Sequence, residues 1–306
     1  MANISAKDVM ELRKKTGCGM MECKKALVES DGNFDEAIKY LREKGLSVAA
    51  KKADRIAAEG IVDILSDNGC TAIIEVNAET DFVAKNQAFK DFVKGILRTI
   101  VANKPADLAA LNALNFDGTD VTVEAELKNM IFTIGENMSI RRFDILDGVV
   151  GTYIHGGGSA GVVTVFDTDC GDKDAFNEYA KNVCMQIAAM NPGYVDIASV
   201  PASVVESEKE ILLTQISNDP KLASKPDAVK EKMVTGRISK FYDNNCLTEQ
   251  AYVKDEDMTV GSYTASVAKE LGGSIKIVKF IKYERGEGIE KREDDFAAEI
   301  DKLVNG

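Results

Sequence analysis

Few residues in this chain have a type and spacing that suit catalysis. His155 is the only histidine, and it precedes a glycine-rich segment, "GGGSAG" (Gly156 to Gly161), that matches the GxGxxG fingerprint of dinucleotide-binding proteins. That fingerprint requires a strand before the glycines and a helix after them. Strand-like residues flank both sides here, so we predict a hairpin turn. As a general base His155 would need a nearby nucleophile or orienting carboxylate, which the sequence does not indicate, so a structural or partner-contacting histidine is favoured.

Metal and redox chemistry are equally poorly supported. The six cysteines are scattered without a CxxC pair, and one histidine cannot complete a typical zinc site. We therefore predict reduced thiols in a cytoplasmic protein, with Cys18 and Cys23 as packing and surface residues. No GxxxxGK[ST] motif is present, so the chain has no P-loop of its own. The sequence predicts no catalytic residue, no cofactor, no metal and no enzymatic activity.

Charge and hydropathy restrict the class of partner. The net charge is −12, but residues 1–55 hold 12 Lys and Arg against 9 Asp and Glu, so the acidity lies in the rest of the chain. An acidic body argues against nucleic acid as a direct ligand, because phosphate binding needs clustered basic residues. The mildly basic beginning could meet an acidic protein face. No apolar run reaches the roughly 18 residues that span a bilayer, so we expect no membrane contact.

A different kind of functional residue stands in the segment "AETDFVAKN" (Ala78 to Asn86). Phe82, a large apolar residue, directly follows Asp81 in what reads as a polar loop. The residues before it, "TAIIEV", predict a strand, and those from Ala88 onward predict a helix. Phe82 therefore lies at a strand-to-helix corner, where its side chain could enter the core or project outward.

An internal repeat favours the outward direction. The strand "TAIIEV" aligns with "AGVVTV" at an offset of 89 residues, and the helix that begins at Ala88 aligns with the one that begins at Ala175 at an offset of 87. The first copy therefore has two additional residues between strand and helix, in the segment that contains "TDF". Packing explains what two copies share, whereas an extension of one copy more often serves a partner.

The first 55 residues predict three short helices followed by an Ala- and Lys-rich helical linker. Ser5 can cap the first helix, and Gly45 is the expected stop of the third. Such a bundle is too small to bury much core and is typical of partner-binding modules. Met20 and Met21 have two interpretations: they fill the core of the bundle, or they form an exposed apolar loop between helices. The residue types alone do not decide.

The rest of the chain predicts an α+β fold. Two helical segments with little strand character form an antiparallel hairpin, which could pair with a second copy in a homodimer, and the end of the chain has helical apolar spacing (Phe296, Ile300, Leu303, Val304). The predicted organisation is a three-helix head (1–55), a core with two copies (56–145, and 146–192 with 243–284), a hairpin insertion (193–242) and a C-terminal docking module with a helix (285–306).

Four segments together resemble the bacterial translation elongation factor Ts family: "TGCGMMECKKAL", "NAETDFVAKN", "IGENMSIRR" and "GEGIEK", in this order. The resemblance runs from the first helix to the C-terminal one. It implies a ubiquitin-associated-like (UBA-like) head, a duplicated antiparallel sheet-plus-helix core, a helical protrusion and a C-terminal module that grips a GTPase.

The resemblance also implies a function. Members of this family are guanine-nucleotide exchange factors for elongation factor Tu, the GTPase that delivers aminoacyl-tRNA to the ribosome. Asp81 and Phe82 correspond to the pair that intrudes near the Mg²⁺ site of that GTPase. The other implied contacts with the GTPase are Thr80 and Val83 beside this pair, Met20, Met21 and Lys24 in the head, and Ile134 and His155 in the core.

Two rival functions remain at this point. The chain could be an interaction scaffold that docks a partner without altering nucleotide affinity, or an enzyme that uses the glycine turn as a cofactor site. The residues by themselves favour a scaffold or regulator over an enzyme, and the resemblance favours the exchange factor.

Overall fold

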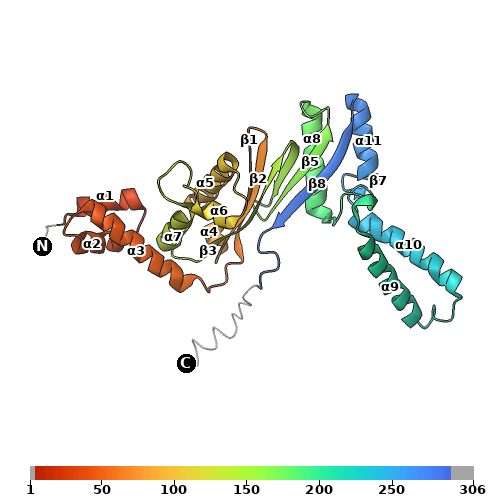
Figure 1. Cartoon of the computed structure of the whole chain (residues 1–306), viewed down its shortest axis with the longest axis horizontal. Helices are drawn as coiled ribbons and strands as arrows, with labels where there is room; N and C mark the ends of the chain where they lie inside the picture. The colour runs from red at the N-terminus through yellow and green to blue at the C-terminus, as the bar shows by residue number, and fades with distance from the viewer. Residues whose placement is uncertain (1–3, 291–306) are drawn as a thin grey trace.

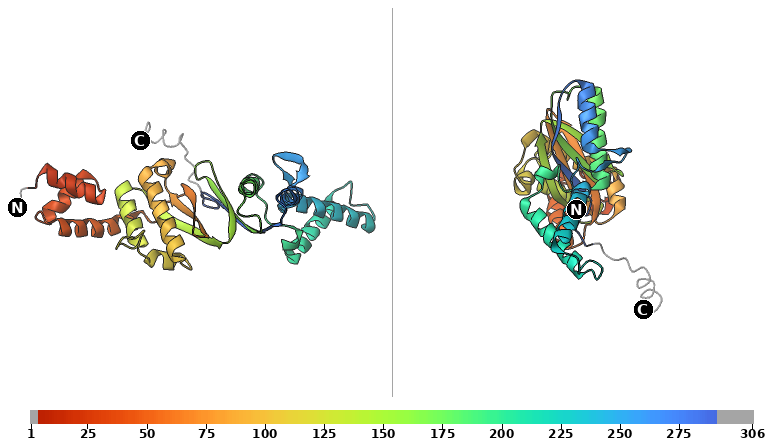
Figure 2. Two further views of the ribbon diagram at one scale, coloured as in Figure 1. Left: turned by 90° about the horizontal axis from the view of Figure 1, so that it is seen from above. Right: turned by 90° about the vertical axis from the view of Figure 1, so that its right-hand side faces the viewer.

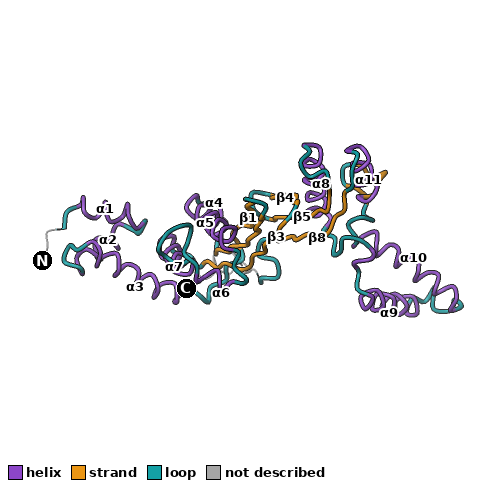
Figure 3. The backbone as a smooth tube through the Cα atoms, turned by 45° about the horizontal axis from the view of Figure 1, so that its top comes forward, coloured by secondary structure: helices purple, strands orange, loops and turns teal. Residues whose placement is uncertain are grey.

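The computed structural model describes residues 4–290, which form an elongated molecule (Figure 1). Three helices lie at one end, two sheets lie in the middle and a helical hairpin projects at the other end, an arrangement that two further views also show (Figure 2). Strands are confined mainly to the central part (Figure 3). The α+β class is as predicted. The predicted C-terminal helix with Phe296 and Ile300 lies outside the described residues.

Local sequence signals explain the limits of the helices in the head. The Ser5 hydroxyl accepts a hydrogen bond from the Asp8 N–H, and Gly17 takes a left-handed conformation (φ 69°) that ends the first helix. The Asn33 side chain accepts from two backbone N–H groups at the start of the third helix. The three helices are α1 (Ala6–Thr16), α2 (Met20–Glu29) and α3 (Phe34–Lys52).

The predicted stop at Gly45 is wrong. Helix α3 continues to Lys52 and packs against α7 (Val123–Ile134). A Cβ atom at Gly45 would lie 3.5 Å from the Cβ of Phe132, an ordinary van der Waals contact, so this residue of α3 lies directly against α7. Gly45 therefore lies inside α3 where this helix contacts α7, and its φ is not in the left-handed region that a C-terminal stop would use.

The first sheet has the antiparallel order β1-β2-β3. Every residue of its central strand β2 is buried, because alternate side chains face opposite layers. Ile74 packs with Phe92 of α5, whereas Ile73 packs with Val163 of the second sheet. The strands and helices of this half are β1 (Glu59–Asp67), β2 (Cys70–Ala78), α4 (Asp81–Lys85), α5 (Gln87–Asn103), α6 (Leu108–Ala113), α7 and β3 (Met138–Asp147).

The second sheet has the antiparallel order β4-β5-β8, with α8 packed on β4 and β5. Helices α5 and α8 each have 17 residues, and both end on a left-handed residue that is not glycine, Lys104 and Asn191. These residues are separated by the same 87 positions as the two predicted helix starts. The elements of this half are β4 (Val149–His155), β5 (Ala160–Thr168), α8 (Asp174–Met190) and β8 (Ile275–Glu284).

The glycine-rich segment forms the turn between β4 and β5, as predicted. Gly156, Gly157 and Gly158 all have positive φ values, which other residues rarely adopt. The Gly158 carbonyl accepts a hydrogen bond from the Val62 N–H at 2.8 Å, so this turn also contacts β1 of the first sheet.

The helical hairpin has a small core of its own, formed by Leu212, Ile216, Val234 and Ile238. Its second helix continues three residues beyond the predicted end of the insertion at residue 242. A short strand pair and a helix that the sequence did not predict then lead to β8. The elements are a 3₁₀ turn (Ile197–Ser199), α9 (Ala202–Asn218), α10 (Asp227–Asn245), β6 (Ala251–Tyr252), β7 (Asp255–Thr259) and α11 (Val260–Leu271).

All six cysteines are free thiols and all are buried, as expected for reduced packing residues. Cys18 and Cys23 both belong to the core of the head, so the expectation of a partly surface position is wrong. Burial raises the pKa of Cys184 to about 12 and that of Cys246 to about 11. The thiolate form is therefore strongly disfavoured at these two positions.

One buried carboxylate, that of Glu75 on β2, joins the first sheet to the end of β8. It accepts hydrogen bonds from Arg141 Nη1 at 3.0 Å, from Arg142 Nε at 2.6 Å and from the Gly286 N–H at 2.8 Å. Burial opposes ionisation of this carboxylate, but these hydrogen bonds and one from Asn77 outweigh burial and lower the pKa of Glu75. The two arginines thus hold the chain that leaves β8 against the first sheet.

We expect Glu75→Gln to lower the free energy of unfolding by about 3 kcal/mol, because the neutral amide leaves two arginines without their buried counter-charge. The lowered pKa adds a pH effect. The stabilisation from ionised Glu75 is complete above the pKa of the unfolded chain, about 4.3, and is lost as the pH falls through the lower folded value. Urea titrations followed by circular dichroism across the acid range should show a shallower loss of stability in the variant.

Glu124→Gln is the matched control. The exposed carboxylate of Glu124 pairs with Lys128 at 2.6 Å on α7, and such surface pairs contribute less than about 1 kcal/mol. Equal losses of stability in the two variants would contradict a special role for Glu75.

Candidate functional site

Phe82 lies at the corner between β2 and α5, and its side chain is 79% exposed. No other large apolar side chain among the described residues has a greater exposed fraction. The outward direction that the repeat predicted is confirmed. The local structure differs from the expected polar loop, because Asp81–Lys85 form the short helix α4.

The opposite face of α4 explains why Phe82 points outward. Val83 and Ala84 are each 5% exposed and belong to the core beneath α5. Successive residues of a helix are about 100° apart, so a single turn that buries residues 83 and 84 leaves residue 82 on the solvent side. Val83, predicted as a partner contact, is therefore a buried anchor of α4.

Asp81 lies beside the exposed ring. Its carboxylate pairs with Lys85 Nζ at 2.6 Å, and the hydrogen bond from Lys85 holds the pKa of Asp81 below its ordinary value. The same ammonium group lies 6.0 Å from the centre of the Phe82 ring. The corner thus presents an apolar ring next to an ionised carboxylate.

Two carboxylates connect this corner to the segment between α7 and β3. Glu136 accepts hydrogen bonds from the Thr80 N–H at 3.0 Å and from the Thr80 hydroxyl at 2.8 Å. Glu79 in turn accepts from the Asn137 N–H at 2.5 Å. We call this reciprocal arrangement of Glu79, Thr80, Glu136 and Asn137 the clasp.

The clasp extends to the end of the head. The Asn137 side chain donates to the carbonyl oxygens of Ala53 and Arg55, at 3.3 and 2.7 Å. The Arg55 guanidinium lies 3.5 Å from the Glu79 carboxylate, and Lys52 donates to the Gly135 carbonyl. The connection between α3 and β1 is therefore bonded to the same residues that hold the Phe82 corner.

The structure decides between the two interpretations of the methionines. Met20 is 49% exposed and Met21 is 73% exposed, both at the start of α2, and Lys24 is exposed one turn later. Other residues fill the core of the bundle (Val9, Leu12, Cys18, Cys23, Ala26, Leu27, Ala37, Leu41). The methionines are thus surface residues.

The two remaining predicted residues occupy different surroundings. Ile134 is half-buried at the end of α7 and packs against the hydrophobic core between the first sheet and α5. It lies two residues before Glu136 of the clasp. His155 is exposed at the end of β4, where its Nδ1 and the Tyr153 hydroxyl form a hydrogen bond at 3.0 Å. Thr80, Asp81 and Phe82 thus share one site with the end of α7, while His155 lies at the glycine turn.

Sequence reasoning missed the roles of Glu79, Glu136 and Asn137. All three lie inside the segments "NAETDFVAKN" and "IGENMSIRR", which the sequence analysis singled out for other reasons. Their pairing crosses more than 50 residues of chain, and no periodicity within either segment indicates it.

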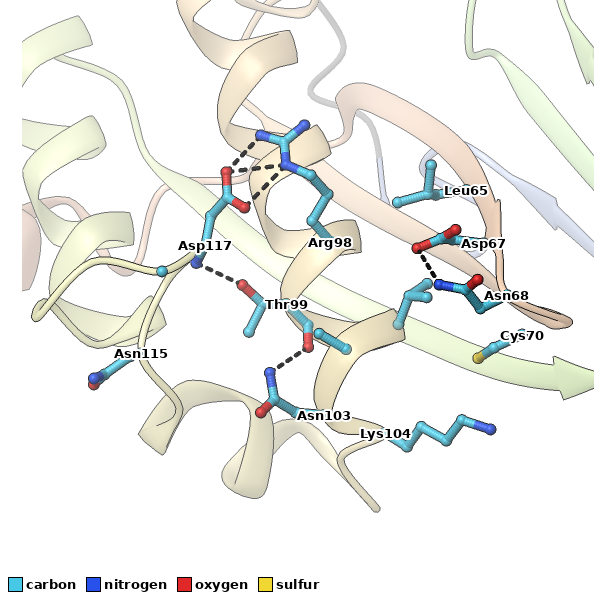
Figure 4. Close-up of a pocket in the computed structure, with 13 residues that line it drawn as sticks. Leu65, Asp67, Asn68, Cys70, Arg98, Thr99, Asn103, Lys104, Asn115 and Asp117 are labelled. Atoms are coloured by element: carbon cyan, nitrogen blue, oxygen red, sulfur yellow. Dashed lines mark hydrogen bonds and ion pairs between the residues drawn. The ribbon is translucent and has the colours of Figure 1, made fainter.

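An open hollow of about 470 Å³ lies beside α5 (Figure 4). Its polar groups bond to one another: Arg98 pairs with Asp117 at 2.6 Å, the Asp117 N–H donates to Thr99, and Asn68 donates to Asp67. These groups satisfy each other's hydrogen bonds, so we assign no ligand to this hollow.

Within residues 4–290, no group of three or more His, Cys, Asp or Glu side chains is arranged to hold a metal ion. None of the helices described there has the length and apolar character needed to cross a bilayer.

Comparisons with known proteins identify the family of this chain. The model of the family "Elongation factor TS" matches residues 79–287, which include the Phe82 corner and the clasp. Elongation factor Ts of Syntrophotalea carbinolica is 49% identical over 300 residues, covering 97% of this chain and 98% of that protein. The proteins of the same name from Clostridioides difficile and Magnetococcus marinus are 47% and 43% identical, each over 99% of this chain, and 100% and 99% of their own lengths are covered. The chain therefore belongs to the elongation factor Ts family.

Proposed function

We propose that this protein is a guanine-nucleotide exchange factor that binds elongation factor Tu carrying GDP, disturbs its Mg²⁺ and phosphate site, and promotes GDP release during translation elongation. Family membership supports the partner. The observation that carries the mechanism is the exposed Phe82 ring on a corner anchored from beneath by Val83 and Ala84.

The energetics define what Phe82 must contribute. A GTPase that holds GDP with nanomolar affinity stabilises that complex by about 12 kcal/mol. An exchange factor accelerates release by binding the nucleotide-free shape better, and this coupling is reciprocal. Burial of the exposed Phe82 ring in an apolar slot of the partner would supply about 1.5–3 kcal/mol towards that shape.

Mg²⁺ explains why a modest distortion suffices. The ion bridges the phosphates and is the largest local charge in a nucleotide site. Loss of its coordination therefore strongly weakens the binding of the nucleotide. In our proposal Asp81 and Phe82 enter together near that ion. The exchange factor then needs no nucleotide site, cofactor or catalytic residue of its own.

The remaining contacts extend the interface. Helix α2 of the head exposes Met20, Met21 and Lys24. The two methionines suit an apolar contact, and Lys24 places a positive charge beside it. Thr80 and the half-buried Ile134 support the Phe82 corner, and the exposed His155 adds a separate contact at the glycine turn.

We also propose that the head is UBA-like and that the core arose by duplication, with 56–145 as one copy and 146–192 with 243–284 as the other. Two three-stranded antiparallel sheets support the duplication, as do two 17-residue helices with equivalent left-handed ends. The segment in which the first copy has additional residues contains Phe82.

Phe82→Ala is expected to slow the factor-dependent release of GDP at least tenfold, because about 1.5–3 kcal/mol of burial is lost from the complex that releases nucleotide. Stopped-flow fluorescence with a labelled GDP on purified elongation factor Tu measures the rate. Val278→Ala, which truncates an exposed side chain on β8, is the control and should exchange normally. Binding with no acceleration by the unmodified protein would instead identify a scaffold.

Met21→Ala is expected to weaken binding to the GTPase by about tenfold, since a largely exposed Met side chain loses its apolar contact. Met10→Ala provides a matched control, because Met10 is 63% exposed on α1 of the same small bundle. Isothermal titration against nucleotide-free elongation factor Tu separates the two variants. Equal affinities would remove α2 from the proposed interface.

A further inference from the structure

We propose that Glu136, supported by Glu79, is a positioning residue that sets the direction of Phe82. This inference rests on the exchange function proposed above and concerns how that function is prepared in the free protein. It is drawn from the clasp, whose two carboxylates accept hydrogen bonds from Thr80 and Asn137.

Helix α4 cannot define its own direction. It has five residues, and helices this short are not stable alone in water. Thr80 occupies the N-cap position, where a threonine hydroxyl usually accepts a hydrogen bond from the helix backbone. Here the Thr80 hydroxyl accepts no hydrogen bond from the helix backbone and instead donates to Glu136.

Glu136 therefore holds the N-cap residue of α4 from a distant segment of the chain. Its carboxylate accepts from both the backbone N–H and the hydroxyl of Thr80, which fixes the backbone and the side chain of the residue that precedes Asp81. Val83 and Ala84 hold the underside of α4 in the core. These anchors act on both sides of Phe82 and fix the direction in which its side chain leaves the backbone.

The other half of the clasp keeps Glu136 in place. Glu79 accepts from the Asn137 N–H, and Arg55 lies 3.5 Å from Glu79 and offsets part of the negative charge of the two carboxylates. A ring that is already oriented loses less conformational entropy when it binds. Loss of the clasp should therefore slow the exchange step itself more than it weakens overall binding.

A double-mutant cycle tests this assignment with the full chain. Glu136→Ala should lower the maximal exchange rate at saturating factor by about tenfold, as for a lost hydrogen bond to a charged group, with a smaller change in the half-saturating concentration. In the Phe82→Ala background the same change should have little further effect. The exposed Glu124→Ala on α7 should leave exchange unchanged.

Thr80→Val gives a milder second variant, because it removes the hydroxyl donor and keeps the backbone N–H, and a smaller slowing is expected. Additive effects of Glu136→Ala and Phe82→Ala would overturn the proposal, as would full exchange rates in Glu136→Ala and Thr80→Val. If Phe82→Ala itself exchanges normally, the exchange mechanism fails instead.

An independent readout does not need the GTPase. The chain contains no tryptophan, so Phe82→Trp introduces a single indole at this corner. Adding Glu136→Ala should lower the fluorescence anisotropy of that indole, while Glu124→Ala should not. Unchanged anisotropy on loss of Glu136 would overturn the positioning role whatever the exchange rates are.

Discussion

The buried carboxylate of Glu75 is the interaction on which the arrangement of this protein depends. It lies on the fully buried central strand of the first sheet and receives hydrogen bonds from two arginines of β3 and from the backbone just after β8. The last strand of the second half is thereby tied to the first half. A buried charge without partners is energetically costly. This carboxylate therefore favours the one arrangement in which β2, β3 and the residues after β8 lie together.

The Phe82 corner uses the same physical device in a more exposed place. There too a carboxylate from one segment binds backbone and side-chain donors of another, and a second carboxylate repeats the exchange in the reverse direction. The apolar underside of α4 supplies the remaining constraint. The buried side of α4 supports the corner, and the Phe82 ring on the other side is exposed to solvent. An intruding side chain requires such a supported and exposed position.

Sequence reasoning succeeded where the deciding interaction is local. Ser5 and Gly17 mark the limits of α1 through contacts within a few residues, and the internal comparison of two strand-to-helix corners correctly placed Phe82 outside. It failed at Gly45, where α3 continues to Lys52 and packs against another helix, α7. It missed α4 because that single turn packs into the core through Val83 and Ala84 and is bonded at Thr80 to the distant Glu136, and neither contact is local. The resemblance assigned Val83 to the interface, whereas that side chain is buried.

The distribution of sulfur in this fold has a chemical consequence. All six thiols are buried, and burial suppresses the reactive ionised form at sites such as Cys184. The thioethers of Met20 and Met21 meet solvent on the head. A mild oxidant is therefore expected to react first with these exposed methionines. Sulfoxide formation there is reversible by reductases and replaces an apolar side chain with a polar one.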